Sequence, residues 1–359
     1  RSAEKYDFVA DRVSMIPRLS PPMLLAAACA WVAPVAGYAI GARASARRGA
    51  RCPAPRAAAA IVTGGTGGIG YATAQLLAAR GDDIVVAYWR DDARATAVCE
   101  ELRATHGVRA AAVRGDLTDE AERERTVARI FENVDADLGG EVSAFVHAAG
   151  FFHPRLLEVH LAGAMANFTM YDQYQSIYPK AFVSIAEGAI ERMADGKGRI
   201  VCITNPGCNA MQTPRVGYDV PGQGKATMEF LVRMYAMRLA ARGLCVNAVS
   251  PGYTDTKEWD KARAQSAASH ARARASEHVH AHARMVDCSL VHRQARMAMG
   301  KGDMEEGRKL LDARMLSRSP MRRWASADEI AQTVHFLCAE QTGLITGATL
   351  PVDGGLHLT

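Results

Sequence analysis

Short apolar runs and longer amphipathic stretches alternate along the chain from residue 57 to residue 359. Apolar runs of this length predict buried strands, and the amphipathic stretches between them predict helices. Alternation of strand and helix is typical of an α/β domain whose parallel sheet is covered by helices on both faces. The sequence therefore predicts one doubly wound parallel sheet of about seven strands, at residues 57–62, 84–89, 108–113, 142–147, 199–203, 245–250 and 349–352. The last helix is expected to begin at Ser326, which forms a capping-box pattern with Glu329.

Residues 1–56 precede this pattern and are predicted to be a targeting or anchoring segment. Residues 22–42 carry no charged side chain and are just long enough to span a bilayer. Arginines follow this run, and no acidic residue occurs between Asp11 and Asp82. This pattern favours plastid-like import into an organelle. The alternatives are a signal anchor, which would give membrane association through residues 22–42, and an Ala-rich disordered leader.

Residues 257–319 interrupt the alternation and are predicted to be an extended helical lid insert. The 63 residues between Thr256 and Pro320 exceed usual loop lengths and are rich in Ala, Arg, His and Met. We expect residues 264–297 to be exposed and poorly ordered, or to be a retained intron in the gene model. The alternative is a basic flap that recognises an acidic carrier protein. No metal site is expected at His278, His280 and His282, because only His278 and His282 share a helix face.

Composition narrows the classes of partner and compartment. The net charge of +5 is concentrated in the leader and the insert, so the presumed catalytic body is acidic. Nucleic-acid binding is therefore not expected. The eight cysteines are scattered without a CxxC pair, which suits a reducing compartment and argues against a disulfide scaffold.

A glycine-rich stretch, Thr63–Gly70, follows the first apolar run and precedes a helical pattern at residues 71–80. Strand, glycine turn and helix form the context that a dinucleotide fingerprint requires. Glycines allow a tight turn there and let backbone N–H groups approach a pyrophosphate at the helix N-terminus. The stretch fits both Gly-x-Gly-x-x-Gly and Thr-Gly-x-x-x-Gly-x-Gly.

The end of the second predicted strand indicates which cofactor binds. An acid there would bind a ribose 2′-hydroxyl, whereas an arginine accommodates a 2′-phosphate. Tyr88 stands in the place of the acid, and Arg90 follows it. This favours NADPH. NADH remains the alternative, because Asp91 and Asp92 come directly after.

From about residue 57 to the C-terminus, apart from the insert, the chain resembles short-chain dehydrogenases/reductases. The resemblance implies a Rossmann-type domain, a nicotinamide-dependent oxidoreductase, and a homo-oligomer, either a dimer or a tetramer. It also implies cofactor contacts from the glycine motif, from an adenine-pocket pair, from a stretch that stands where the family has Asn-Asn-Ala-Gly, and from the Thr of a Pro-Gly motif. In this sequence those residues are Gly64, Thr66, Gly68, Ile69 and Gly70; Asp116 and Leu117; His147, Ala148 and Gly150; and Thr256. Val352–Gly355 matches the family's C-terminal motif.

The catalytic residues depart from the family's commonest pattern, which is Ser followed by Tyr-x-x-x-Lys. Tyr218 and Lys225 are seven residues apart, a Tyr-x6-Lys spacing similar to the enoyl-thioester reductase branch. Asn205 stands where the Ser is expected, with Thr204 and Cys208 as the other candidates. Tyr178 replaces the Asn that usually supports the Lys through water.

Tyr218 and Lys225 are predicted to have different roles in catalysis. A tyrosine with a pKa of about 10 is a poor acid at neutral pH. We expect Lys225 to lower the pKa of Tyr218 and to hold the nicotinamide ribose, while Tyr218 supplies a proton to an oxygen that gains charge. The expected activity is NADPH-dependent reduction of an activated C=C or C=O in a small-molecule, CoA-linked or carrier-linked substrate. Enoyl thioesters are slightly preferred. The alternatives are a ketoacyl or carbonyl reductase and a catalytically silent cofactor-binding scaffold.

Overall fold

The computed structural model describes residues 58–151, 168–209, 212–214, 218–256, 309, 312–313 and 315–359. The leader, residues 264–297 and the histidine run from His278 to His282 lie outside the described residues, so the interpretations given for them stay predictions. In the described ranges, no helix combines the length and the apolar character needed to cross a membrane.

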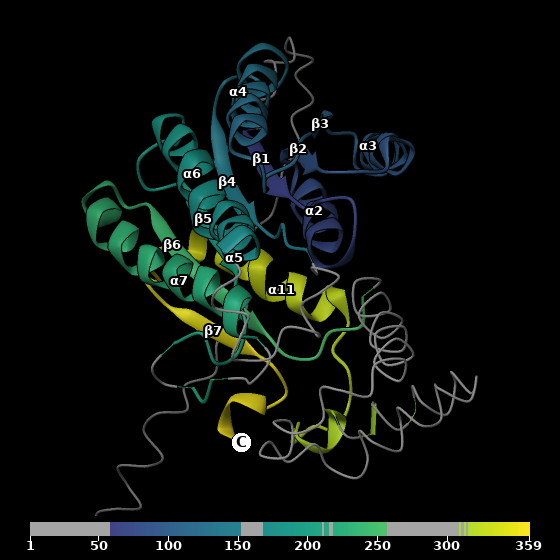
Figure 1. Cartoon of the computed structure of the whole chain (residues 1–359). Helices are drawn as coiled ribbons and strands as arrows, with labels where there is room; N and C mark the ends of the chain where they lie inside the picture. Colours follow the sequence, from purple (N-terminus) through teal and green to yellow (C-terminus); the bar gives the residue numbers. More distant parts are fainter. Residues whose placement is uncertain are drawn as a thin grey trace, which may run out of the picture. The chain divides into compact units, whose positions relative to one another are not determined.

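Seven parallel strands form one sheet in the order β3-β2-β1-β4-β5-β6-β7 (Figure 1). This confirms the doubly wound α/β prediction, and the predicted strands lie within two residues of the observed ones. The connection from β3 to β4 crosses back past β1, so the order reverses between β1 and β4. A switch of this kind opens a crevice at the carboxyl ends of the strands. The strands are β1 (Ala59–Thr63), β2 (Asp83–Tyr88), β3 (Ala110–Arg114), β4 (Val142–His147), β5 (Arg199–Ile203), β6 (Cys245–Pro251) and β7 (Thr349–Val352).

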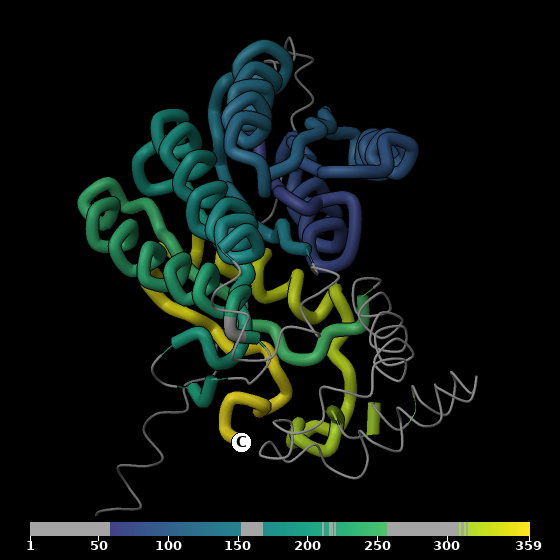
Figure 2. Tube along the Cα trace, viewed as in Figure 1, coloured from purple at the N-terminus to yellow at the C-terminus, as the bar shows by residue number. Residues whose placement is uncertain are grey.

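Successive side chains of the strands enter two separate cores, which is why the strand sequences are mostly apolar. In β1, Ile61 faces one core and Val62 faces the other. The first core is closed by α4 (Glu120–Asp137), α5 (Phe168–Gln175), η2 (Ser176–Lys180), α6 (Ala181–Glu191) and α7 (Asp219–Leu239). The second is closed by α2 (Gly68–Arg80), α3 (Asp92–His106) and α11 (Ala327–Leu337). Figure 2 follows the chain through these elements, from the purple β1 to the yellow β7. Short 3-10 turns lie at η3 (Ala240–Arg242), η5 (Glu340–Thr342) and η6 (Leu356–Leu358).

Local sequence signals explain several helix ends. Ser326 accepts a hydrogen bond from the Glu329 amide at 3.1 Å, and Glu329 accepts one from the Ser326 amide at 2.9 Å. The predicted capping box therefore opens α11. Asp91 and Asp119 cap α3 and α4 in the same side-chain-to-backbone manner.

Between α5 and α6 the backbone widens into the single π-turn η2, which contains Pro179. Proline has no amide hydrogen and its ring clashes with the carbonyl four residues earlier, so a regular α-turn is not available there. Tyr178 lies in this turn and is 3% exposed. The π-turn therefore fixes where the Tyr178 side chain enters the core.

Candidate active site

The glycine motif packs closely against the end of β4. Gly64 has a left-handed φ of 67°, and a Cβ there would lie 2.9 Å from the Ala148 carbonyl oxygen. A Cβ at Gly70 would lie 2.3 Å from the Gly64 carbonyl oxygen. Only glycine fits these two positions without a backbone shift. The turn after β1 is thereby held beside the backbone that follows β4.

The N-terminus of α2 is suited to an anion. Its N-cap is Gly67, no side chain caps it, and no acidic residue lies in its first turn. A Cβ at Gly67 would meet no atom within 4 Å, so space is open beside the free amides. Ile69 lies in this first turn. Thr256, which follows β6 in the chain, lies close to the same turn, because its Cγ2 would be 3.4 Å from a Cβ placed at Gly68. Backbone amides at a helix N-terminus fit the pyrophosphate of a dinucleotide.

The two acids after β2 are engaged within the protein. Asp91 accepts a hydrogen bond from the Arg94 amide at 2.9 Å and caps α3. Asp92 accepts hydrogen bonds from the Tyr88 hydroxyl at 2.9 Å and from Arg114 at 3.2 Å. Arg90 is exposed and stacks on Trp89, with its Cζ 3.5 Å from the ring centroid. The end of β2 therefore offers a guanidinium group, while its carboxylates already have partners.

Arg94 is a second guanidinium that the sequence analysis did not identify. It is half-buried, its Nε donates to the Thr66 carbonyl oxygen at 3.3 Å, and its Cζ lies 4.7 Å from the Tyr71 ring centroid. Arg94 thus reaches the glycine turn from α3. Nothing in the linear spacing showed this, because it depends on where α3 begins.

The predicted adenine-side pair follows β3. Asp116 accepts hydrogen bonds from the Thr118 amide at 2.8 Å and the Thr118 hydroxyl at 2.6 Å. Leu117 is buried, and its carbonyl oxygen accepts a hydrogen bond from the Ser176 hydroxyl at 2.9 Å. This turn is therefore tied to η2.

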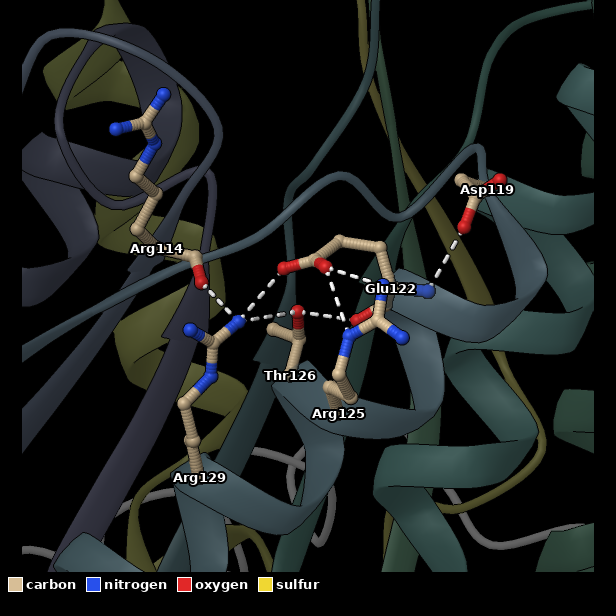
Figure 3. A network of polar contacts seen from close by, with 6 residues as sticks. All are labelled: Arg114, Asp119, Glu122, Arg125, Thr126 and Arg129. Carbon is tan, nitrogen blue, oxygen red and sulfur yellow. Dashed lines mark hydrogen bonds and ion pairs between the residues drawn. The ribbon is translucent and has the colours of Figure 1, made fainter.

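A polar network on α4 fixes the same turn from the other side (Figure 3). Arg129 donates to the Arg114 carbonyl oxygen at 2.7 Å and to Glu122 at 2.8 Å. The hydrogen bond from Arg125 and the one from Arg129 lower the pKa of Glu122, which remains a carboxylate. The network anchors the start of α4 against the end of β3.

His147 joins three elements through its ring. Its Nδ1 lies 2.9 Å from the Thr63 hydroxyl, and its Nε2 lies 2.9 Å from the Ile177 carbonyl oxygen. Since a carbonyl only accepts, Nε2 carries the proton and Nδ1 accepts from Thr63. The ring is fully buried, and burial lowers its pKa to about 4. We expected His147 to contact the cofactor. Its ring has partners on both sides within the protein, so a cofactor contact from His147 would come from its backbone and stays a prediction.

Tyr218, Lys225 and Tyr178 meet beside the end of β5. Tyr218 is the N-cap of α7, and seven residues make nearly two helical turns, so Lys225 returns to the same face. The Lys225 Nζ lies 6.0 Å from the Tyr218 ring centroid and 5.1 Å from the Tyr178 ring centroid. It donates to the Thr204 carbonyl oxygen at 3.1 Å. The structure thus brings together the predicted phenol and ammonium, with a second phenol beside them.

The electrostatics of this group differ from the expectation that Lys225 lowers the pKa of Tyr218. Part of Tyr218 is exposed, yet burial of the phenol raises its pKa, while a hydrogen bond from Tyr178 lowers it. Lys225 acts on the other phenol. Burial raises the pKa of Tyr178 well above the ordinary value, and the charge of Lys225 lowers it. The ammonium is closer to the Tyr178 ring than to the Tyr218 ring.

The three candidates for the family's Ser occupy different environments. The Asn205 side chain is half-buried and donates to the Pro206 carbonyl oxygen at 3.2 Å. Thr204 is fully buried, and its hydroxyl donates to Glu229. Burial raises the pKa of the Cys208 thiol to about 11, so it is protonated at neutral pH and is not a thiolate nucleophile. Of these three side chains, that of Asn205 is the most exposed.

Glu229 is a buried carboxylate that the sequence analysis missed. It is 2% exposed and also accepts hydrogen bonds from Asn209 at 3.1 Å and Thr349 at 3.4 Å. It lies one turn after Lys225 on α7 and holds the segment after β5. A charged residue four positions after Lys225, in an otherwise apolar helix face, was the available signal. Within the described ranges, no group of three or more His, Cys, Asp or Glu side chains is arranged to hold a metal ion.

Comparisons with known proteins identify the family of the chain. A family model described as Enoyl-(Acyl carrier protein) reductase matches residues 64–302 and 294–357. The chain belongs to the short-chain dehydrogenase/reductase family. It is therefore an NAD(P)-dependent oxidoreductase.

Individual relatives match more than four fifths of the chain. The chain is 27% identical to acetoacetyl-CoA reductase from Allochromatium vinosum over 83% of its own length and 98% of that protein. It is 28% identical to 1-cyclohexenylcarbonyl-CoA reductase from Streptomyces collinus, covering 85% and 89%. Among solved structures, it resembles a blue fluorescent protein from a metagenomic library in complex with NADPH, with 26% identity, a TM-score of 0.60, and coverage of 83% and 97%.

This short-chain dehydrogenase/reductase departs from the family pattern at the start of α7. Pro221 stands four residues before Lys225, where the commonest pattern has Tyr. Tyr218 lies one turn earlier, at the N-cap. The Tyr218 phenol therefore projects from the N-cap of α7, whereas the tyrosine of the commonest family pattern would stand at position 221, inside the helix.

Proposed function

We propose that the chain uses NADPH to reduce the activated C=C or C=O of an acyl thioester, with enoyl thioesters preferred. The observation that carries this proposal is the pairing of Tyr218 with Lys225 on one face of α7, in a chain whose glycine turn is suited to a dinucleotide. The Tyr-x6-Lys spacing, which is similar to the enoyl-thioester reductase branch, favours C=C over C=O.

The choice of NADPH rests on the end of β2. Asp91 and Asp92 already accept hydrogen bonds from Arg94, Tyr88 and Arg114, and a ribose hydroxyl would have to share these carboxylates with them. Arg90 and Arg94 supply positive charge near the glycine turn, as a 2′-phosphate requires. The similar metagenomic blue fluorescent protein is itself a complex with NADPH.

The residues of the chain supply binding, orientation and the proton. When bound, NADPH supplies the hydride. The backbone of Gly64 to Gly70 and Thr256 would hold the dinucleotide, and Lys225 would hold its nicotinamide ribose. Tyr218 gives its hydroxyl proton to the substrate oxygen that gains charge, and that oxygen forms the new O–H bond as the Tyr218 O–H bond breaks. In an enoyl thioester this oxygen is the carbonyl, and in a ketone it is on the attacked carbon.

Two of the relatives support a thioester substrate but point to both kinds of bond, whereas others are named as sugar reductases, which act on a C=O. Acetoacetyl-CoA carries a ketone, whereas 1-cyclohexenylcarbonyl-CoA carries a conjugated C=C, and both names describe CoA thioesters. The carbonyl reductase is therefore the second candidate.

A direct comparison of substrates tests the proposal. Crotonyl-CoA and acetoacetyl-CoA are offered with NADPH, and consumption of NADPH is followed. We expect faster turnover of crotonyl-CoA. Faster turnover of acetoacetyl-CoA would favour the carbonyl reductase, and no turnover of either, with NADPH still bound, would favour a silent scaffold.

The proton donor is tested in the same assay. Tyr218→Phe should bind NADPH normally and lose about 10²-fold or more in turnover, the range for a lost general acid. Arg238→Ala, a change at an exposed side chain thirteen residues after Lys225 on α7, serves as the control. If Tyr218→Phe turns over at the wild-type rate, the proton comes from elsewhere.

A further inference from the structure

The buried carboxylate of Glu229 takes no part in the reaction described above, although it lies one turn after Lys225 on α7. Burying a carboxylate is unfavourable unless hydrogen-bond donors replace the water that it loses. The carboxylate accepts from the Thr204 hydroxyl, from the Asn209 side-chain amide at 3.1 Å and from the Thr349 hydroxyl at 3.4 Å. These partners show which part of the site Glu229 holds.

Two of the donors stand at the two ends of the turn that follows β5. One carboxylate oxygen of Glu229 accepts from Thr204, and the other accepts from Asn209. Between them in the chain stands Asn205, the half-buried candidate for the place of the family's Ser. A single carboxylate of α7 therefore fixes this turn at its beginning and at its end.

Thr204 is held through each of its polar groups. Its hydroxyl donates to Glu229, and its amide donates to the Val249 carbonyl oxygen of β6 at 2.9 Å. Its own carbonyl oxygen accepts from the Lys225 Nζ at 3.1 Å. The residue is fully buried, so these hydrogen bonds form in a medium of low dielectric constant, where they are strong. The Thr204 carbonyl oxygen is therefore a rigid acceptor for the ammonium.

Lys225 depends on such an acceptor. A lysine carries its charge on a flexible four-carbon stem, so the position of the ammonium is set by the groups that it contacts. An ammonium has three donors, of which one bonds to Thr204, and the others would bind the ribose hydroxyls. In the commonest family pattern an Asn supports this Lys through water, and Tyr178 replaces that Asn here. The Thr204 carbonyl oxygen supports Lys225 directly.

We propose that Glu229 is a positioning residue for Lys225. Its carboxylate fixes Thr204, and the Thr204 carbonyl oxygen then sets where the ammonium stands when the nicotinamide ribose binds. This inference rests on the proposed function, in which Lys225 holds that ribose. No proton moves in this role, because Glu229 only accepts hydrogen bonds. It acts on the reaction through Thr204 and Lys225, without touching cofactor or substrate.

Thr204→Val tests this role, because valine has nearly the shape of threonine and lacks the hydroxyl that Glu229 holds. We expect kcat to fall about tenfold to hundredfold, since a small displacement of a group that orients the reactants causes losses of that size. NADPH should bind about twofold to tenfold more weakly, the range for one lost hydrogen bond. Thr204→Ser keeps the hydroxyl and should restore both values.

Thr349→Val is the matched control. It removes another hydroxyl from the same carboxylate, but Thr349 belongs to β7 and the contact between Glu229 and Thr204 remains. We expect wild-type kcat and NADPH binding in this variant. A loss as large as that of Thr204→Val would mean that Glu229 only stabilises the fold, and the inference would be wrong.

A double-mutant cycle with Lys225→Ala separates positioning from a general loss of stability. The Kd for NADPH is measured, because binding can be followed when turnover is lost. Thr204→Val should weaken binding in the wild-type background and have little further effect in the Lys225→Ala background, where the ammonium is absent. Glu229→Gln is taken through the same cycle with the same expected outcome, and it covers the case in which Thr204→Val does not fold.

The outcomes of the cycle distinguish this inference from the proposed function. If Lys225→Ala weakens NADPH binding and turnover, but Thr204→Val and Glu229→Gln act equally in both backgrounds, only the positioning role of Glu229 fails. Wild-type kcat and Kd in Thr204→Val would overturn that role in the same way. If Lys225→Ala itself binds NADPH and turns over crotonyl-CoA as the wild type does, the proposed function is overturned together with this inference.

Discussion

Arg90 and Arg94 differ in how the protein holds them. Arg90 is exposed and contacts Trp89, so its guanidinium can reorient toward a ligand. Arg94 is half-buried and already donates to the Thr66 carbonyl oxygen of the glycine turn. Arg94 therefore has two roles, since it holds the turn and adds charge there.

These roles predict different losses on substitution. Arg90→Ala should weaken NADPH binding about tenfold to a hundredfold while leaving NADH binding nearly unchanged, since a charge-assisted hydrogen bond contributes about 1.5–3 kcal/mol. Arg94→Ala should weaken both cofactors, because the glycine turn loses a support, and NADPH more than NADH. Titration of each variant with both cofactors measures this, and Arg238→Ala is the control. Equal losses for both cofactors in Arg90→Ala would show that Arg90 does not contact a 2′-phosphate.

At the scale of elements, the buried side chain of His147, at the end of β4, connects β1 and η2 through hydrogen bonds. Its ring accepts from Thr63 and donates to Ile177, and both bonds require the neutral form with the proton on Nε2. Protonation would put a charge in the core and remove the acceptor that Thr63 uses. The two hydrogen bonds of the His147 ring therefore depend on pH.

The sign of this dependence follows from the lowered pKa of His147. Its pKa is about 4 in the folded chain and about 6.5 when unfolded, so the unfolded state binds the proton more tightly. The stability that the neutral ring contributes is present above pH 6.5 and is lost as pH falls toward 4. The free energy of unfolding should decrease by about 3 kcal/mol across this window. Denaturant titrations of wild type and His147→Asn at a series of pH values measure it. The variant should lack this part of the slope, and identical slopes would show that His147 does not titrate there.

The elements were predictable to different degrees, for physical reasons. The strands β1 and β5 were found because they are buried on both faces and therefore read as apolar runs. The capping box at Ser326 is local chemistry and was also found. The π-turn was missed, because a proline usually ends a helix, and only packing against His147 and α7 shows that the helix continues through Pro179. The pairing of Lys225 with Tyr178 was likewise invisible, since it depends on two elements that are distant in sequence.

At the scale of the whole molecule, α7 carries a row of apolar side chains that are exposed on the surface. Phe230, Met234 and Met237 are 52%, 41% and 78% exposed and lie at helical spacing. Exposed patches of this kind are typical of contact surfaces between proteins. This agrees with the homo-oligomer that we expect from the family, which stays a prediction.

The insert interrupts the family pattern. The family model matches in two pieces that meet at residues 294–302, inside the insert. Residues 264–297 contain only two acids, Glu277 and Asp287, and show no apolar periodicity that would bury a face. We therefore propose that this stretch adds nothing to the catalytic body. The leader is proposed to direct or anchor that body and likewise to be dispensable for catalysis.

Removal of residues 264–297 tests the role of the insert. We expect a folded enzyme that binds NADPH and turns over crotonyl-CoA at about the wild-type rate, because no residue assigned to the site lies in this stretch. The same variant is assayed with a crotonyl group on an acyl carrier protein, which serves as the matched comparison. A raised KM for the carrier-linked substrate alone would show that the basic stretch recognises an acidic carrier, because the attraction between opposite charges is lost only there. Loss of turnover on crotonyl-CoA, with NADPH still bound, would mean that the stretch works as part of the substrate lid and is not dispensable.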